Sequence, residues 1–504
     1  MIRPLLACLL AALPVMASAQ TAPVTLRIAM REDADMMDPS LARTYVGRIV
    51  FAGLCDKLFD IDDKLQIIPQ LATGYEWSDP KTLVIHLRTG VKFQDGTMMD
   101  AAAVKYSLDR HYNMAGSARR SEISVMDHVD VVDPQTVRLV LKGPSAPFLS
   151  QLTDRAGMIV SPKAAEAEGK DFALHPVCAG PMKFVERVAQ DHITLERFAD
   201  YWDKDSIHVD RVIYQVIPDS SVRLANLQAG SVDLVEYITP TDIDAVKRNP
   251  KLRLVTYDGL GYQGITYNLA NGPKADSPIG KSALVRQAFD ASIDRDALMQ
   301  VVYNGMFPAA GQAVPPESPF YAASVKPVAR DVDRAKALLK QAGVKLPVPV
   351  ELIVPNSPDQ RQMGEVIQSM ASEAGFDVKL TAMEFAASLD NAQQGGFQAY
   401  LLAWSGRIDP DGNLYSFIHS TTGTQNYGHY SSPAMDKLLD DARLETDQAK
   451  RKALYQQVAE LGQKDVPISY IFTTRYFNGV SAKISGFKPV ADGLIRLQGI
   501  KVAP

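Results

Sequence analysis

The first half of the chain alternates hydrophobic and polar positions in short runs. Leu83, Ile85 and Leu87 occupy every second position, which predicts a hairpin over residues 81–95 that turns at Thr89-Gly90. Asp100 is placed to cap a helix that begins directly after it. Further alternating strands are predicted at residues 137–141 and 192–196. This half therefore predicts a mixed α+β arrangement.

The second half alternates strands with amphipathic helices. A helix capped by Asp331 is predicted to stop at Gly343, and a second, with Met363 and Ile367 on its apolar face, to stop at Gly375. Strands are predicted at residues 350–354, 378–380 and 397–403. Strands alternating with helices predict a largely parallel α/β sheet. Because ligands of such sheets bind beyond the carboxyl ends of the strands, the segments that follow residues 354 and 403 are the first candidates for a site.

The N-terminus has the three parts of a secretory signal. Arg3 supplies a positive charge, residues 5–15 are almost purely apolar, and Ala17-Ser18-Ala19 gives the small-x-small pattern that precedes cleavage. The apolar run is shorter than the roughly 20 residues that span a bilayer. We therefore expect residues 1–19 to be a signal peptide, cleavage before Gln20, and a periplasmic protein.

Length and charge narrow the class further. Removing 19 of the 504 residues leaves 485, and chains of this length divide into two or more domains because cores stop growing at about 250–300 residues. The sequence has no long linker between domains and no clear internal repeat, so we expect the domains to share interwoven strands. The 53 basic residues are balanced by 58 acidic ones, which argues against nucleic acid as a partner.

Two cysteines follow the expected cleavage site, Cys55 and Cys178. In an oxidising compartment such a pair predicts one disulfide, and the alternative is two separate buried thiols. No second Cys or His stands at ligand spacing near either residue, so no metal site is expected.

Partial catalytic signatures occur, and each lacks its context. Residues 259–264 match the G-x-G-x-x-G fingerprint, but residues 265–269 pattern as a strand where a dinucleotide site needs a helix. Gly280-Lys281-Ser282 resembles the end of a P-loop, yet Ala275 stands where the first glycine belongs. We therefore expect no cofactor and no enzyme activity.

Several segments resemble one protein family. Residues 91–97 and the helix over 102–108 resemble a hallmark segment of the family 5 extracellular solute-binding proteins, which include the dipeptide- and oligopeptide-binding proteins of ABC importers. The likeness continues in consistent order over almost the whole chain after the signal, at residues 179–184, 195–202, 225–233, 285–295 and 404–411.

The resemblance implies an α/β, two-lobed periplasmic-binding-protein fold with a hinge. Lobe I would comprise residues 20–57, 178–262 and 478–504, with an extra α+β subdomain at 58–177, and lobe II residues 263–477. Such a protein would capture a small peptide-like or carboxylate-bearing solute between its lobes and deliver it, as a monomer, to a permease and its ATPase.

Two arginines are the most informative candidates for ligand binding. Peptide-binding members of the family often have an aspartate just after a Trp-x-Gly motif, where it pairs with the ligand's amino group, but here that position is Arg407. A guanidinium matches a carboxylate instead. Arg361 resembles the arginine that meets the ligand carboxylate in dipeptide-binding relatives. For either residue the alternative is a salt bridge that holds its own loop.

The remaining candidates lie on loops expected to face the cleft, and they are Thr44, Tyr45, Tyr262, Gln263, Trp404, Ser405, Gly406, Asp409, Asn426 and Tyr427. Other solutes are alternatives within the same fold: an opine, a glutathione-like compound, an oligosaccharide, haem or a metal chelate. A periplasmic hydrolase, or a receptor or chaperone without a transport role, would belong to a different class.

Overall fold

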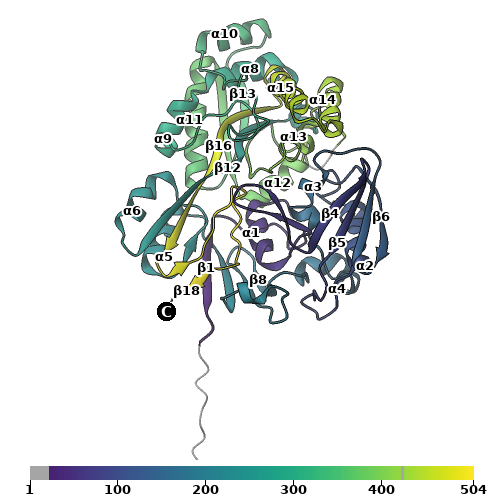
Figure 1. Cartoon of the computed structure of the whole chain (residues 1–504). Helices are drawn as coiled ribbons and strands as arrows, with labels where there is room; N and C mark the ends of the chain where they lie inside the picture. Colours follow the sequence, from purple (N-terminus) through teal and green to yellow (C-terminus); the bar gives the residue numbers. More distant parts are fainter. Residues whose placement is uncertain (1–21, 422–424, 504) are drawn as a thin grey trace, which may run out of the picture.

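Two lobes share one mixed sheet in the computed structural model, which describes residues 22–421 and 425–503 (Figure 1). The expected signal peptide, residues 1–19, lies outside the described residues. Within the described residues ten strands of this sheet follow the order β14-β13-β15-β12-β16-β11-β1-β10-β9-β8. None of the described helices has the length and apolar composition of a membrane span.

The lobes are connected by two long antiparallel strands, β12 (Leu252–Tyr267) and β16 (Ile468–Ser481). Figure 1 shows them running side by side between the two lobes. Their pairing is irregular between Asp258 and Tyr262, where the chain passes from lobe I to lobe II. This topology is compatible with the lobe boundaries drawn from the sequence, which we keep as a proposal.

The glycines of the G-x-G-x-x-G stretch lie inside β12, at this crossover, and not at a strand-to-helix turn. A Cβ atom at Gly261 would lie 1.8 Å from the carbonyl oxygen of Trp404. The glycine therefore serves the close approach of two backbones.

Lobe I is built around a central strand, β1, which pairs in parallel with both β10 and β11. Its core packs α1 against this sheet through Val46, Ile49, Val50 and Leu54. The strands and longer helices of this lobe are β1 (Thr25–Met30), α1 (Tyr45–Leu54), β8 (Met182–Val188), β9 (His192–Arg197), β10 (Arg211–Val216), α5 (Ser220–Ala229), β11 (Leu234–Val235), α6 (Ile243–Arg248), β17 (Ile484–Ser485) and β18 (Lys501–Val502).

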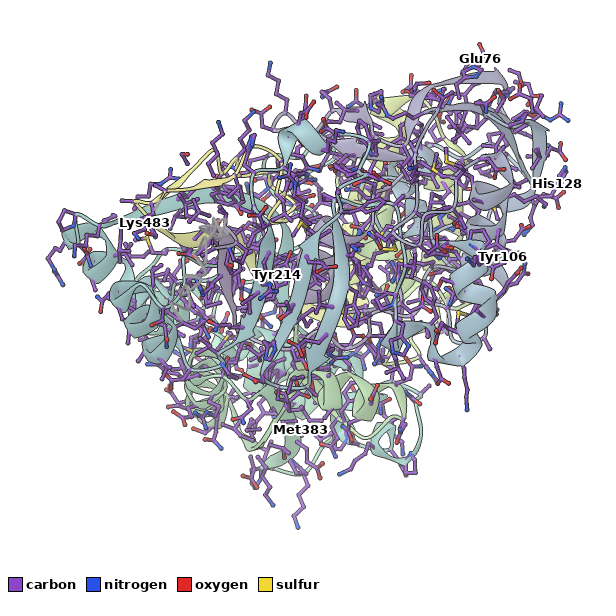
Figure 2. All side chains as sticks on the ribbon, turned by 90° about the horizontal axis from the view of Figure 1, so that it is seen from below. Glu76, Tyr106, His128, Tyr214, Met383 and Lys483 are labelled. Atoms are coloured by element: carbon purple, nitrogen blue, oxygen red, sulfur yellow. A yellow bond between two sulfur atoms is a disulfide. The ribbon has the colours of Figure 1, made fainter. Side chains whose placement is uncertain are left out.

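The subdomain inserted into lobe I has its own antiparallel sheet, in the order β4-β5-β7-β6, and its own core. Figure 2 shows Glu76, Tyr106 and His128 of this subdomain together at one side of the molecule, opposite Lys483. Its elements are β2 (Phe59–Ile61), β3 (Ile67–Pro69), β4 (Ala72–Asp79), β5 (Thr82–Leu87), α2 (Ala101–Asn113), β6 (Met126–Asp133), β7 (Thr136–Leu141), α3 (Phe148–Gln151) and α4 (Pro162–Glu168).

In the subdomain, the sequence patterns predicted where helices and strands lie better than they predicted which strands pair. The helix expected after Asp100 is confirmed, and its cap is the Asp100 side chain, which accepts from the backbone N–H of Ala103. The hairpin expected over residues 81–95 is wrong, because β5 pairs with β4 on one side and β7 on the other. Alternation shows which side chains of a strand are buried but not which strand lies beside it.

Lobe II has the expected parallel arrangement, since β13 pairs in parallel with both β14 and β15. Asp331 caps α10 and Gly375, at φ +102°, ends α11. Its elements are α7 (Pro278–Lys281), α8 (Ala283–Ser292), α9 (Arg295–Tyr303), α10 (Val332–Gln341), β13 (Val348–Pro355), α11 (Pro358–Ala374), β14 (Phe376–Met383), α12 (Phe385–Gln393), β15 (Ala399–Trp404), α13 (Asp411–Ile418), α14 (Pro433–Leu444) and α15 (Gln448–Asp465).

A disulfide joins Cys55 to Cys178, as the sequence predicted, with their Cα atoms 4.9 Å apart. Cys55 ends α1, before the chain enters the subdomain, and Cys178 lies where the chain returns to lobe I. The bond therefore closes the neck of the subdomain across a sequence separation of 123 residues.

We expect the Cys55→Ser/Cys178→Ser double variant to be less stable by about 2–4 kcal/mol, because a disulfide that closes a long loop restricts the unfolded chain. Urea unfolding of the oxidised protein and the variant measures the difference. The subdomain should lose its protection from proteolysis first. Two free thiols in the oxidised protein, found by mass spectrometry, would contradict the assignment.

Candidate functional site

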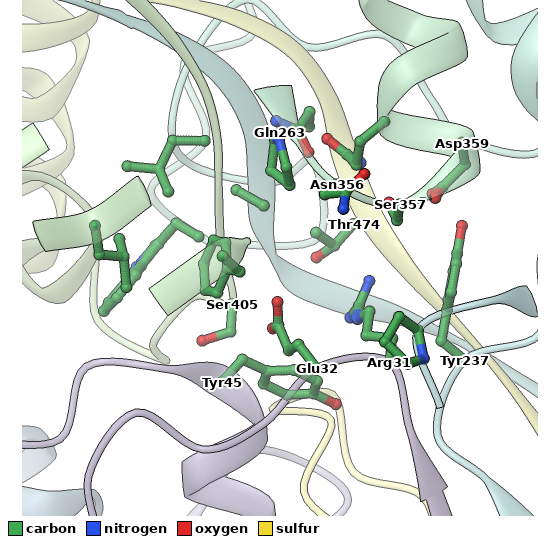
Figure 3. A pocket seen from close by; sticks show the side chains of 18 of the residues that line it. Arg31, Glu32, Tyr45, Tyr237, Gln263, Asn356, Ser357, Asp359, Ser405 and Thr474 are labelled. Carbon is green, nitrogen blue, oxygen red and sulfur yellow. Dashed lines mark hydrogen bonds between the residues drawn. The ribbon is translucent and has the colours of Figure 1, made fainter. Parts of the chain in front are cut away.

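A cavity of about 290 Å³ lies between the two lobes and is lined from both of them (Figure 3). Figure 3 shows Arg31, Glu32 and Tyr45 on the lobe I side, and Asn356, Ser357 and Asp359 on the lobe II side. The crossing strands contribute Gln263 and Thr474. The cavity is thus lined by both lobes and by the strands that connect them.

Strand direction explains why these residues meet. Because β11 and β15 each run antiparallel to one of the crossing strands, the carboxyl ends of both point toward the crossover. β1 runs parallel to β11 and β13 parallel to β15, so their carboxyl ends lie at the same level. The segments after β1, β13 and β15 therefore all reach the cavity, as the general rule for α/β sheets expects.

Aromatic side chains form much of the wall. Arg31 lies between two of them, with its guanidinium carbon 5.7 Å from the ring centre of Tyr45 and 4.7 Å from that of Tyr237. Tyr303, Phe307 and Phe472 form a contiguous cluster in which ring centres are 4.5–5.5 Å apart. Such walls exclude water and leave orientation to a few polar groups.

The arginines on the wall mostly have carboxylate partners. Arg31 pairs with the buried Glu236, with Nε 3.1 Å from a carboxylate oxygen. Arg43 contacts Asp35 and, across the cleft, Asp390 at 2.5 Å. Arg475 pairs with Asp258 at 2.7 Å, and the buried Arg223 donates to the carbonyls of Ile217 and Pro218 at 2.7 Å.

The carboxylates on the wall are different. Glu32 has no hydrogen-bond or ion-pair partner anywhere in residues 22–421 or 425–503. Burial, followed by the charges of Glu236, Glu384 and Asp35, raises the pKa of Glu32 to about 8, although Arg31 opposes the shift. Among the described residues, Asp359 accepts only from the hydroxyls of Ser357 and Tyr303, and Glu384 only from the backbone N–H of Ala387.

Five of the twelve ligand-binding candidates from the sequence line this cavity: Tyr45, Gln263, Trp404, Ser405 and Tyr427. Thr44 lies beneath the wall, where it caps α1 and accepts from Gly47 N–H. Tyr262 is buried against Tyr470, and Gly406, at φ +82°, lies against the backbone of Leu260.

Arg407 and Arg361, the two arginines expected to meet a ligand carboxylate, are not on the wall of this cavity. Arg407 stacks on Trp404, with its guanidinium carbon 4.5 Å from the ring centre, and pairs with Asp154 of the subdomain at 3.4 Å. Arg361 is exposed on the first turns of α11. The geometry favours the alternative reading for Arg407, a salt bridge, although with the opposite lobe instead of its own loop.

Two further candidates have structural partners. Asp409 accepts two hydrogen bonds from Arg451, at 2.6 and 2.7 Å. The amide of Asn426 donates to the carbonyls of His419 and Tyr430. Neither side chain has its polar atoms directed at the cavity, and both fix the loops of lobe II.

Sequence reasoning missed Arg31, Glu32 and Glu384. The same rule that pointed to the segments after residues 354 and 403 would have found the first two, because they follow directly after β1. Glu384 carries a weaker signal, since it follows β14 and caps α12. No group of three or more His, Cys, Asp or Glu side chains in the described part of the chain is arranged to hold a metal ion.

Comparison with known proteins agrees with this architecture. The family model described as bacterial extracellular solute-binding proteins, family 5 middle, matches residues 66–425. A dipeptide-binding protein of Escherichia coli is 30% identical over 455 residues, 84% of each chain. A glutathione-binding protein of Pectobacterium atrosepticum is 29% identical over 94% of this chain and 93% of that protein.

Among solved structures, an ABC transporter-associated periplasmic binding protein of Helicobacter pylori in complex with a peptide superposes with a TM-score of 0.87. It is 25% identical, and the match covers 96% of this chain and 99% of that one. The two lobes, the crossing strands and the family model together place the chain. It belongs to the family 5 extracellular solute-binding proteins, which are the substrate-binding components of ABC importers.

Proposed function

We propose that this protein captures a small peptide-like or carboxylate-bearing solute in the periplasm and delivers it to an ABC permease and its ATPase. The observation that carries the proposal is the cavity, whose walls come from both lobes and which can hold a ligand only while the lobes are closed. The binding of peptides and glutathione by the relatives supports the same solute class.

The size of the cavity favours a small ligand. Its volume of about 290 Å³ lies just below the roughly 300–1,000 Å³ that is usual for small-molecule sites. A compound of di- or tripeptide size fits this space better than an oligosaccharide or haem. The side-chain amide of Asn356, which has no hydrogen-bond partner among the described residues, offers a donor and an acceptor for a peptide group.

Closure is supported by a buried contact between the lobes. Asp154 of the subdomain accepts from Arg48 of α1 at 2.8 Å and lies 3.4 Å from Arg407 of lobe II. Arg48 also donates to the Ser405 hydroxyl across the cleft, at 3.0 Å. The arginines hold the pKa of Asp154 well below its usual range, whereas burial lowers the pKa of Arg407 to about 10.

We infer that Arg407 contributes to affinity through closure and not through contact with the solute. A ligand that touches both lobes stabilises the closed state. Contacts between the lobes such as Arg407–Asp154 make closure less unfavourable, so a larger part of the ligand's binding free energy appears as affinity. No catalytic step is included, so a bound peptide should be released unchanged.

The first test is a thermal-shift screen of unfolded, ligand-stripped and refolded protein against di- and tripeptides, glutathione, opines, dicarboxylic acids and oligosaccharides. Ligand at 100 times Kd should stabilise the protein by about 2.7 kcal/mol. We expect hits among the peptides or peptide-like acids, with compaction visible by small-angle X-ray scattering. Hits confined to oligosaccharides, or hydrolysis of the ligand, would contradict the proposal.

The mature protein should begin at Gln20, because signal peptidase reads the Ala17-Ser18-Ala19 motif that precedes it. N-terminal sequencing of protein recovered from the periplasm of an expressing bacterium checks this. A chain that retains Met1 and stays with the membrane fraction would contradict it.

Arg407→Ala should weaken the binding of every ligand by a similar factor, about 10- to 150-fold, because a hydrogen bond to a charged group is worth roughly 1.5–3 kcal/mol. Asp154 keeps Arg48 and Arg155 as partners, so the variant should fold. Titration calorimetry with a peptide and its C-terminal amide measures the effect. Arg248→Ala, an exposed arginine on α6, is the control.

A loss confined to ligands with a free carboxylate would show instead that Arg407 contacts the ligand. In that case the affinity of the C-terminal amide would be the same in the variant and the unaltered protein. Equal losses for both ligands would support the role in closure.

A further inference from the structure

Positive and negative side chains on the cavity wall differ in how far other residues of the protein compensate their charge. Arg31, Arg43 and Arg475 each have a carboxylate partner in the protein, Glu236 at 3.1 Å, Asp390 across the cleft at 2.5 Å and Asp258 at 2.7 Å. Arg223 lies against two backbone carbonyls. The guanidinium charge that faces the cavity is therefore largely compensated by the protein itself.

The acidic side chains lack such compensation. Within the described residues no Lys, Arg or His comes within ion-pair distance of Glu32, Asp359 or Glu384. Asp359 and Glu384 at least accept hydrogen bonds from hydroxyl or backbone groups, whereas Glu32 accepts none. Figure 3 shows the Glu32 carboxylate directed into the cavity from lobe I. A carboxylate that is removed from water without a partner is unfavourable, so this position favours a cation.

A second carboxylate lines the same cavity from the other lobe. Glu384 stands at the junction of β14 and α12, on the wall of the same cavity, and its charge raises the pKa of Glu32. Closing the lobes without a ligand therefore places two carboxyl groups that lack a cationic partner on one cavity, where Glu32 either keeps its charge against the repulsion of Glu384 or takes up a proton. A cation between them would change this repulsion into two attractions.

We propose that a protonated amine of the solute binds between Glu32 of lobe I and Glu384 of lobe II. An ammonium group has three N–H donors, which allows it to donate to both carboxylates at once. This assignment rests on the proposed function, since it names the group of a peptide-like solute that the cavity recognises. It also accounts for Arg407: the position after Trp-x-Gly does not serve the amine here, because it pairs with Asp154.

The arrangement couples recognition to closure. The two carboxylates come from different lobes, so an amine can satisfy both only when the lobes are closed. A solute of the same shape without the amine would leave the repulsion in place. The protein should therefore discriminate between a solute with the amine and one without it more strongly than a single solvent-exposed ion pair would allow.

The test compares L-alanyl-L-phenylalanine with propionyl-L-phenylalanine, which has the same shape but lacks the amine. We expect the first to bind at least about 30-fold more tightly, as measured by titration calorimetry, because leaving a buried charge unpaired is costly. In Glu32→Gln the ratio should fall to about threefold or less, through weaker binding of the dipeptide.

Matched variants separate a binding role from a structural one. Glu32→Gln should have a melting temperature in the absence of ligand equal to or above that of the unaltered protein, because it removes a half-buried carboxylate that has no cationic partner. Glu384→Gln should also reduce the ratio, while its side-chain oxygen still caps α12. Glu76→Gln, an exposed glutamate of the subdomain, makes the same change in net charge and should leave the ratio unaltered.

The outcomes distinguish the amine site from the solute class. Equal binding of both compounds by the unaltered protein, or an unchanged ratio in Glu32→Gln, would overturn the amine site and leave the peptide-like solute standing. If neither compound binds, the proposal that the solute is a dipeptide is wrong. The amine site is then tested separately, by comparing the thermal stabilisation that phenethylamine and 2-phenylethanol give. Stabilisation by phenethylamine alone, lost in Glu32→Gln, would support the site, and no stabilisation would overturn it.

Discussion

The antiparallel pair of β12 and β16 is the constraint on which the remaining structure depends. Each strand belongs to both lobes, so the sheets of lobe I and lobe II extend from the same two backbones. Once their direction is set, the pairing of β11 and β15 with them sends the carboxyl ends of the neighbouring strands toward the crossover. The position of the cavity follows from this polarity, and the glycines at 259 and 261 permit the close packing that the crossover requires.

Burial explains the charge pattern around the cavity. Most arginines on the wall have a carboxylate partner elsewhere in the protein, because an uncompensated guanidinium in a closed cleft would be unfavourable. Glu32 lacks the equivalent partner. In an open protein water would solvate it, so the unfavourable interaction arises only on closure. A cleft of this kind stays open until a solute supplies the missing cation, which is the behaviour that an importer needs from its binding protein.

Arg407 shows how a motif can be found correctly and its role still be misjudged. The Trp404–Arg407 segment does follow a strand that ends at the cleft, and Trp404 and Ser405 do line the cavity. The guanidinium turns away to Asp154, 253 positions earlier in the chain. A short motif defines which side chain is present at a position, whereas its direction depends on the charges that the other lobe presents.

The sequence by itself indicated the family, through the resemblance of several segments. It also predicted the α/β class, the strand–helix alternation of lobe II and the disulfide between Cys55 and Cys178, because periodicity, caps and cysteine number are local or compositional properties. It did not determine that β5 pairs with β7, that Arg407 pairs with Asp154, or that Glu32 and Glu384 line one cavity. These depend on which distant segments the crossing strands bring together. Pairing across a sheet and charge across a cleft are properties of tertiary contacts, and only the folded chain decides them.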